Sequence, residues 1–155
     1  MRWLVLCSLL AACGPKRGAR GEGRFQLGAL GGGWKAVDPG GADLAWYNAG
    51  LLGSIYADSN CNKRHDDATL HDSMRHLTAG LLAGAPLREE ELRLDGRAAL
   101  MRVYDVTLDG VALRMGAAVL NKDTCTYDVV YLAPTARFED GWSDFVGAVA
   151  GFETP

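Results

Sequence analysis

Residues 92–113, which read LRLDGRAALMRVYDVTLDGVAL, decide the fold of this 155-residue chain. Two Asp-Gly pairs, Asp95-Gly96 and Asp109-Gly110, each stand between short apolar runs. Asp-Gly favours a two-residue type I′ turn because both of its positions tolerate a positive φ angle. The stretch therefore predicts two successive β-hairpins.

The pattern continues towards the C-terminus. A third, slightly longer turn over residues 121–123 is expected between strands at residues 115–120 and 124–132, and Pro134 ends the last strand. Together with the two hairpins, this predicts a four-stranded antiparallel meander.

Three shorter strands are expected before the meander. Turn-forming residues separate them, and aromatic and β-branched residues fill them. The third strand alternates, with Ile55, Ala57 and then Cys61 on one side. The three expected strands cover residues 34–37, 43–48 and 54–59.

Two amphipathic helices complete the pattern. The first is expected to be capped by Asp66 or Asp67 and to end before Gly84 and Pro86, and the second is expected to begin near Glu139 or Asp140. Each carries one apolar stripe. The stripes are Leu70, Met74, Leu77 and Leu81 in the first helix, and Trp142, Phe145, Val146, Val149 and Phe152 in the second. The order βββαββββα predicts an α+β domain, an antiparallel sheet of about seven strands covered by two helices.

The first residues have the form of an export signal. Arg2 precedes an apolar run over residues 3–10, which is shorter than the roughly 20 residues needed to cross a bilayer. Leu10-Ala11-Ala12-Cys13 resembles the lipobox of bacterial lipoproteins, in which the cysteine receives a diacylglycerol and becomes the mature N-terminus. The resemblance implies a signal peptide at residues 1–12 and a lipid anchor at Cys13. The alternative is an ordinary cleaved signal in which this cysteine is incidental.

Residues 13–24 are expected to form a Gly/Arg-rich tether, and residues 25–155 a single domain. The tether has a net charge of +3 from Gly14 onwards, whereas the domain has a net charge of −7. An acidic domain argues against nucleic-acid binding, which requires a basic face. Gly14 replaces the aspartate that retains enterobacterial lipoproteins in the inner membrane. The implied location is therefore the outer membrane, facing the periplasm.

The cysteines separate into two groups. Cys7 leaves with the leader, and Cys13 takes the lipid. Cys61 and Cys125 remain as a pair in a chain bound for an oxidising compartment, and this predicts a disulfide between them. Two reduced, buried thiols are the alternative.

The element order resembles that of the PsbP-like α/β/α fold. The leading strand with Trp34, the hairpin at residues 92–98 and the closing Trp/Phe helix carry the resemblance. It implies a sandwich that serves as a non-catalytic accessory protein. It implies no family active site, so no functional residues are transferred.

The histidines His65, His71 and His76 lie close together in the sequence, near several aspartates. On a helix, His71 and His76 would point about 140° apart, whereas a helical metal pair needs i,i+4 spacing. The sequence therefore predicts no metal site and no cofactor. A metal-dependent hydrolase using His65, His71 and Asp67 is the least favoured alternative.

No catalytic set is expected elsewhere. The chain has no Gly-x-Ser-x-Gly elbow and no Ser-x-x-Lys, and the glycines at residues 31–33 are not followed by the Lys-Ser/Thr of a phosphate loop. Six aromatic side chains on predicted strands are expected in the core, or in a ligand or protein surface if several share a solvent face. They are Trp46, Tyr47, Tyr56, Tyr104, Tyr127 and Tyr131.

These observations favour a membrane-anchored envelope lipoprotein that is not an enzyme and that acts as a protein-interaction or accessory module with an envelope protein partner. A small-ligand-binding lipoprotein, with a cleft between sheet and helix, is the main alternative.

Overall fold

The computed structural model describes residues 24–61, 68–81 and 84–155. Within these residues, seven strands and two helices follow one another in the predicted order. The elements are β1 (Trp34–Ala36), β2 (Leu44–Asn48), β3 (Gly53–Asn60), α1 (Leu70–Leu77), β4 (Arg88–Leu94), β5 (Arg97–Leu108), β6 (Val111–Lys122), β7 (Cys125–Ala133) and α2 (Phe138–Ala150).

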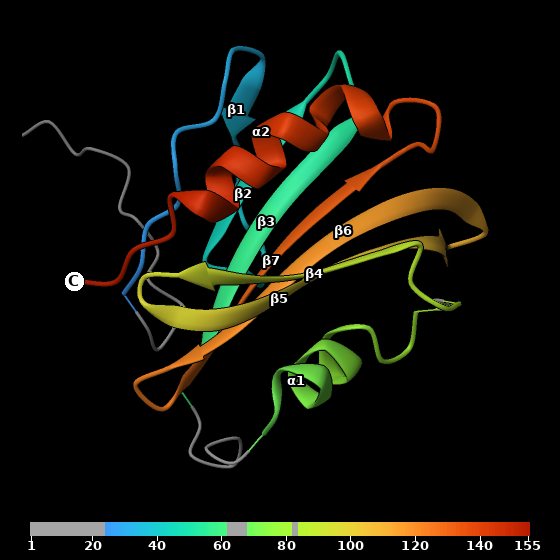
Figure 1. Ribbon diagram of the computed structural model, residues 1–155. Helices are drawn as coiled ribbons and strands as arrows, with labels where there is room; N and C mark the ends of the chain where they lie inside the picture. The colour runs from blue at the N-terminus through green and yellow to red at the C-terminus, as the bar shows by residue number, and fades with distance from the viewer. Residues whose placement is uncertain (1–23, 62–67, 82–83) are drawn as a thin grey trace, which may run out of the picture.

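The strands form one antiparallel sheet in the order β1-β2-β3-β7-β6-β5-β4 (Figure 1). The first three strands make one meander and the last four make another, and the pairing of β3 with β7 joins the two. Between the meanders the chain leaves the middle of the sheet and passes through α1 to the far edge at β4. The α+β prediction is confirmed.

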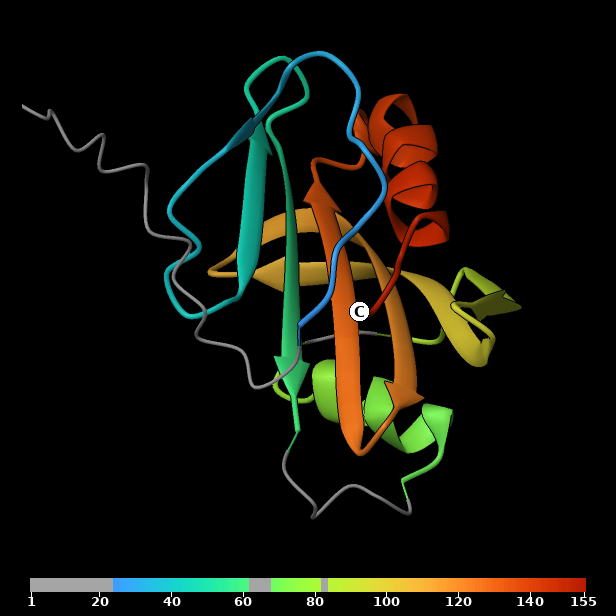
Figure 2. The ribbon, with the colours of Figure 1, turned by 90° about the vertical axis from the view of Figure 1, so that its left-hand side faces the viewer.

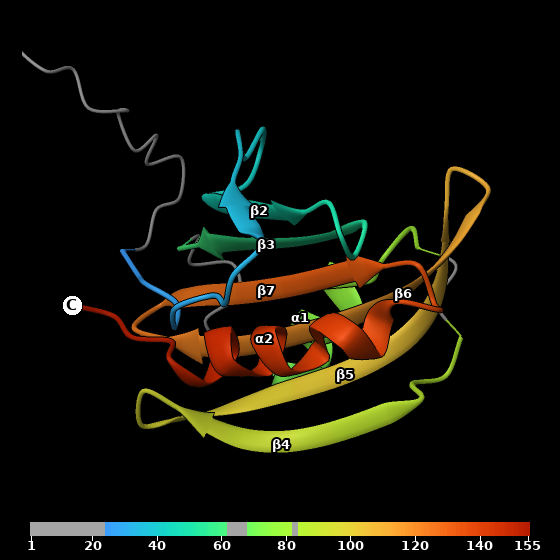
Figure 3. The same cartoon turned by 90° about the horizontal axis from the view of Figure 1, so that it is seen from above.

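A hydrophobic core lies on each face of the sheet. In Figure 3, seen from above, α2 lies over the strands and α1 lies beneath them. The core under α2 is rich in large aromatic side chains, among them Tyr131, Phe138, Phe145 and Phe152. The core under α1 is smaller and mostly aliphatic, with Met74 at its centre.

The hairpin turns follow the sequence chemistry. Asp95, Gly96, Asp109 and Gly110 all have positive φ angles, which confirms the two predicted type I′ turns. The third turn differs from the prediction. β6 runs through Lys122 and β7 begins at Cys125, so the turn has two residues, both with positive φ angles. A turn without glycine is tolerated here because the two long flanking strands impose the register.

Helix α1 is shorter than its apolar stripe suggests. Asp66 and Asp67, the expected caps, lie outside the described residues, and the observed N-cap is Thr69. Its hydroxyl accepts from the backbone N–H of Asp72, and the Asp72 carboxylate accepts from the Thr69 N–H, which makes a capping box. The helix ends at Leu77, where the Thr78 hydroxyl bonds back to the Met74 carbonyl oxygen.

Helix α2 is covered on its flank by the chain that precedes β1. Residues 25–30 run over the same face of the sheet as α2 (Figure 2). The Gly28 N–H donates to the Ala148 carbonyl oxygen at 2.9 Å, and the Trp34 indole N–H donates to the Asp144 carboxylate at 2.8 Å. The N-terminal segment therefore closes this side of the sandwich.

The start and the end of the described chain lie together. Gln26 and Glu153 form an antiparallel bridge, and Thr154 donates to the Asp95 carboxylate in the β4–β5 turn. The β5–β6 turn lies at the opposite end of the molecule (Figures 1 and 3). The 12 residues of β6 separate the two ends by about 40 Å, at roughly 3.3 Å per residue.

Candidate functional site

The predicted anchor at Cys13 and residues 13–23 of the predicted tether lie outside the described residues, so lipidation stays a prediction. In the part of the chain that the structure describes, none of the helices has the length and apolar character to cross a membrane.

The predicted pair of cysteines is joined in the structure. Cys61 follows β3 and Cys125 begins β7, and a disulfide links them over a separation of 64 residues. Asn60 pairs with Thr126 in the sheet, so the disulfide continues the β3–β7 ladder by one position. It therefore fastens the two meanders where they meet.

The histidines do not form a metal centre in the described chain. His71 lies on α1 with its Nδ1 2.8 Å from the guanidinium of Arg102, which also donates to Glu89 at 2.6 Å. His65 and Asp67 lie outside the described residues. Among the described residues, no three His, Cys, Asp or Glu side chains are grouped so that they could hold a metal ion.

A groove of about 440 Å³ opens between α1 and strands β4 and β5, and we call it the α1–β4 groove. By the β4–β5 register, Glu91, Arg93, Ala98 and Leu100 lie on the α1 face of the strands, whereas Leu92 and Ala99 belong to the core under α2. Its lining residues are Leu70, His71, Glu91, Leu92, Arg93, Ala98, Ala99 and Leu100.

The groove exists because α1 is too short to cover the width of the sheet. The helix packs on β6 and β5, which leaves the α1 face of β4 exposed at Glu89, Glu91 and Arg93. β4 is also the last strand of the sheet in the described part of the chain, so its outer edge has no neighbouring strand there. An open groove beside an unpaired strand edge is a site that accepts an extended peptide, which can add to the edge and place side chains in the groove.

A row of three carboxylates crosses the sheet near the disulfide. Asp58 of β3 and Asp128 of β7 stand directly opposite each other on the α1 face, and Asp43 lies beside them. Asp43 Oδ2 accepts from the hydroxyl and the N–H of Ser59. Its Oδ1 is buried without a hydrogen-bond partner in the described part of the chain.

The row shifts the acidity of its members. Burial, and then the neighbouring charges of Asp58 and Asp43, raise the pKa of Asp128 to about 7. Burial also raises the pKa of Asp58. The hydrogen bond from the Ser59 N–H lowers this pKa in part, and the neighbouring charge of Asp43 raises it further. Like charges opposite each other repel. Asp128, where β7 meets β3, therefore takes up a proton as the pH falls through neutrality.

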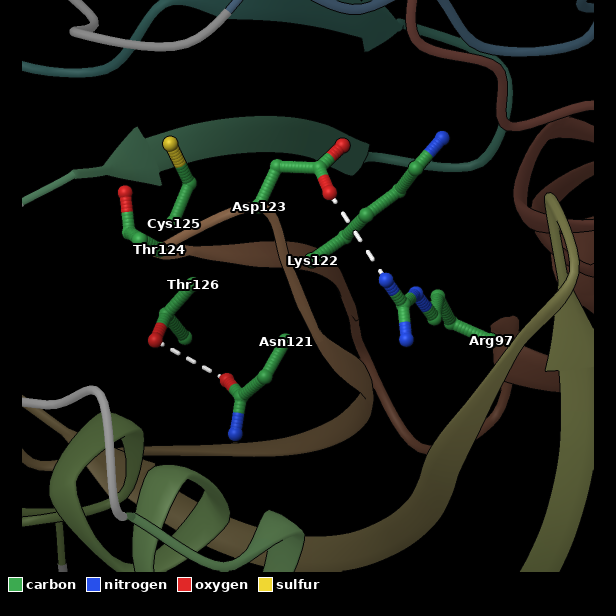
Figure 4. Close-up of a pocket in the computed structure, with 7 residues that line it drawn as sticks. All are labelled: Arg97, Asn121, Lys122, Asp123, Thr124, Cys125 and Thr126. Carbon is green, nitrogen blue, oxygen red and sulfur yellow. Dashed lines mark hydrogen bonds and ion pairs between the residues drawn. The ribbon is translucent and has the colours of Figure 1, made fainter.

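A second, smaller hollow of about 230 Å³ lies at the β6–β7 turn (Figure 4). Arg97 faces Asp123 across it at 3.7 Å, and the Thr126 hydroxyl donates to Asn121 at 2.9 Å. A third polar group of the hollow, the Lys122 ammonium, donates to Asp95 and Thr154 outside it. Asn121 also accepts from Ser73 and donates to the Ala68 carbonyl oxygen, so it fixes the start of α1 to the sheet.

The aromatic side chains on the strands mostly belong to the core, as predicted. Tyr104, Tyr127 and Tyr131 are buried, Trp46 and Tyr56 are half-buried, and Tyr47 is exposed. They do not gather on one solvent face, because Trp46 and Tyr56 pack into opposite cores. The groove and the carboxylate row, in contrast, were not anticipated from the sequence.

No protein-family model matches the chain. No curated protein matches it in sequence.

Solved structures do match. The cyanobacterial PsbP protein, CyanoP, of Synechocystis sp. PCC 6803 superposes with a TM-score of 0.58 at 16% identity, over 94% of this chain and 99% of that chain. The fold is PsbP-like. LpqN of Mycobacterium tuberculosis, involved in cell envelope biogenesis, superposes with a TM-score of 0.60 at 12% identity, over 89% of this chain and 87% of that chain.

A Pseudomonas aeruginosa protein of unknown function also shares the fold, with a TM-score of 0.54 at 15% identity over 89% of this chain and 87% of that chain. Identities this low establish a common architecture, and a common architecture hosts many functions.

Proposed function

We propose that this chain is a membrane-anchored envelope lipoprotein without catalytic activity, and that it acts as a protein-interaction or accessory module. The leader supplies the anchor at Cys13, and the −7 charge of the domain keeps the domain off an anionic membrane surface. The proposed location is the outer membrane, on its periplasmic side. The fold that this chain shares with an envelope-biogenesis protein and with a PsbP protein supports the proposal.

The observation that carries the proposal is the α1–β4 groove beside the unpaired edge of β4. Beside the groove, Arg102 pairs with Glu89 and with His71, and within it Arg93 donates to the Gly96 carbonyl oxygen. Such an arrangement offers backbone hydrogen bonds and apolar contact, and the described residues that line it include no nucleophile with an adjacent base. We propose the groove as the docking surface for an extended segment of an envelope protein.

The experiment is site-specific photo-crosslinking in intact cells. A photoreactive side chain replaces Ala98, which is exposed in the groove, and in a matched variant it replaces Ser143, which is exposed on the outer side of α2. We expect one discrete envelope-protein adduct from position 98 and none from position 143. The same adduct pattern at both positions, or no adduct at either, contradicts the proposal.

Small-ligand binding is the second candidate because a volume of about 440 Å³ lies in the range of about 300–1,000 Å³ typical of small-molecule sites. Native mass spectrometry of the purified full chain separates the two. A bound molecule that is lost in Ala98→Trp, but kept in Ala112→Trp on the far hairpin, supports a small ligand. If the groove instead docks a protein segment, both variants should have the mass of the unliganded chain.

A further inference from the structure

Strands β5 and β6 form a two-stranded ribbon that extends beyond both of their neighbours. β4 leaves β5 at Val103, whose carbonyl oxygen accepts from the Leu87 N–H at 2.7 Å, and β7 leaves β6 at Arg114. Within the described residues, the segment Tyr104–Leu108 therefore has β6 on one side and no strand on the other. Figure 3 shows the ribbon projecting at the end opposite the termini.

One face of the ribbon is apolar along its whole length. Three cross-strand pairs follow one another on the α1 face: Tyr104 with Met115, Val106 with Leu113, and Leu108 with Val111. The first pair is buried in the core under α1. The last pair is open to solvent, since Leu108 is 39% and Val111 is 56% exposed. Apolar side chains thus continue from the core out to an uncovered tip.

The backbone of the free edge is also available. In an antiparallel strand, alternate residues direct both their N–H and their C=O to the same side. The Val103 carbonyl oxygen points towards β4, so Asp105 and Thr107 point their backbone groups to the same, open side. Both residues are exposed, and the edge carries none of the lysine or proline residues that protect free strand edges.

We propose that Tyr104–Leu108 is a dimerisation edge, which pairs antiparallel with the same segment of a second copy of this chain about a two-fold axis at Val106. In this register Asp105 lies opposite Thr107 of the second copy, and these are the residues whose backbone groups point outwards. They exchange hydrogen bonds, while Val106 meets its own counterpart and Leu108 is covered by Tyr104 of the second copy.

Charge favours this register and a second copy as the occupant. Asp105 already pairs with Arg114 of its own ribbon at 2.8 Å, and it faces an uncharged threonine across the interface. A shift of the axis to Thr107 would set Asp105 against Asp109, two like charges. In one register, therefore, the backbone groups, the apolar side chains and the charges of the edge all match those of a second copy. The dimer places the two C-termini at its outer ends, since the ribbon projects at the end of the molecule opposite the C-terminus.

Cysteine crosslinking of the full chain in its membrane tests the proposal. Val106→Cys replaces a side chain of similar size at the two-fold axis, where the Cβ atoms of a non-hydrogen-bonded pair lie at a distance suited to a disulfide. Ala112→Cys is the matched control because its side chain lies on the same hairpin but on the other face. We expect a reducible species of twice the chain mass from Val106→Cys, and none from Ala112→Cys or the wild-type chain. No such species, or an adduct of any other mass, overturns the proposal.

Sedimentation of the detergent-solubilised full chain gives a second measurement. The wild-type chain should be dimeric, and Leu108→Lys should raise the dissociation constant of the dimer by about tenfold, because it places a charge in the apolar row. Ala112→Lys should remain dimeric. Thr107→Pro removes an outward N–H without breaking a β5–β6 hydrogen bond and should also weaken the dimer. A monomeric wild-type chain, or equal effects of Leu108→Lys and Ala112→Lys, contradicts the proposal.

Discussion

The two faces of the sheet are built differently, although one sheet carries both. The α2 face is closed by a 13-residue helix, by the segment before β1 and by stacked aromatic rings such as Tyr131 on Phe138 and Phe145. The α1 face is covered by an 8-residue helix and leaves the α1–β4 groove and the apolar ribbon tip uncovered. The comparison indicates that the α2 face maintains the fold, whereas the α1 face is available for binding.

The largest expected effect comes from truncating one side chain on each face. Phe145→Ala removes a fully buried ring from the α2 face and should lower the free energy of unfolding by about 3–5 kcal/mol. Leu70→Ala truncates a half-buried side chain at the groove and should cost about 1 kcal/mol. Urea unfolding of the two variants measures both values. Equal costs would show that the two faces contribute alike to stability.

The next effect concerns the carboxylate row on the α1 face. The pKa of Asp128 is raised from 3.8 to about 7, so the folded protein holds this proton more tightly than the unfolded chain does. Ionisation therefore costs stability as the pH rises above 3.8, and the full penalty applies above pH 7. Asp128→Asn should raise the free energy of unfolding by about 2 kcal/mol at pH 8 and by little at about pH 4.

Asp109→Asn, in an exposed turn where asparagine is equally suitable, serves as the control and should change stability little at either pH. A gain from Asp128→Asn that is the same at both pH values would rule out the raised pKa of Asp128, which comes from burial and then from the neighbouring charges.

The smallest effect tests the closure of the α2 face. A Cβ at Gly28 would lie 2.5 Å from the Gly147 carbonyl oxygen, a backbone atom of α2. Gly28→Ala should therefore cost about 1–2 kcal/mol by overpacking. Gly147→Ala adds a Cβ to open space on the same helix and should stabilise by about 0.5–1 kcal/mol. Thermal unfolding of both variants checks the signs. A neutral Gly28→Ala would show that the N-terminal segment is only loosely held.

The strand order of the C-terminal meander follows from local chemistry, which is why the sequence predicts it well. The Asp95-Gly96 and Asp109-Gly110 turns fix two hairpins before any tertiary contact is known. The Asp123-Thr124 turn was misplaced because it has no glycine, and its conformation is imposed by two long strands. The start of α1 was also misplaced, because four candidate caps, Asp66, Asp67, Thr69 and Asp72, stand close together.

The candidate site was harder to predict because it depends on distances between elements. Glu91 and His71 face one groove only because α1 crosses above β5, and no local pattern encodes that crossing. Asp58 and Asp128 look like ordinary strand residues until the β3–β7 register places them opposite each other. The disulfide could have indicated that register, because Cys61 and Cys125 stand three positions from these two aspartates.

The Cys61–Cys125 link also determines how the molecule would respond to mechanical force. It closes residues 61–125 into a covalent loop, so a pull applied between the tether and the C-terminus passes from Cys61 directly to Cys125. Helix α1 and strands β4, β5 and β6 lie inside this loop, so their backbone carries no tension once the sheet has opened. The disulfide therefore prevents the 64 residues of the loop from being extended, which removes about 230 Å of contour length at up to roughly 3.6 Å per residue. In the oxidised protein, the α1–β4 groove and the ribbon therefore lie outside the covalent path of the load.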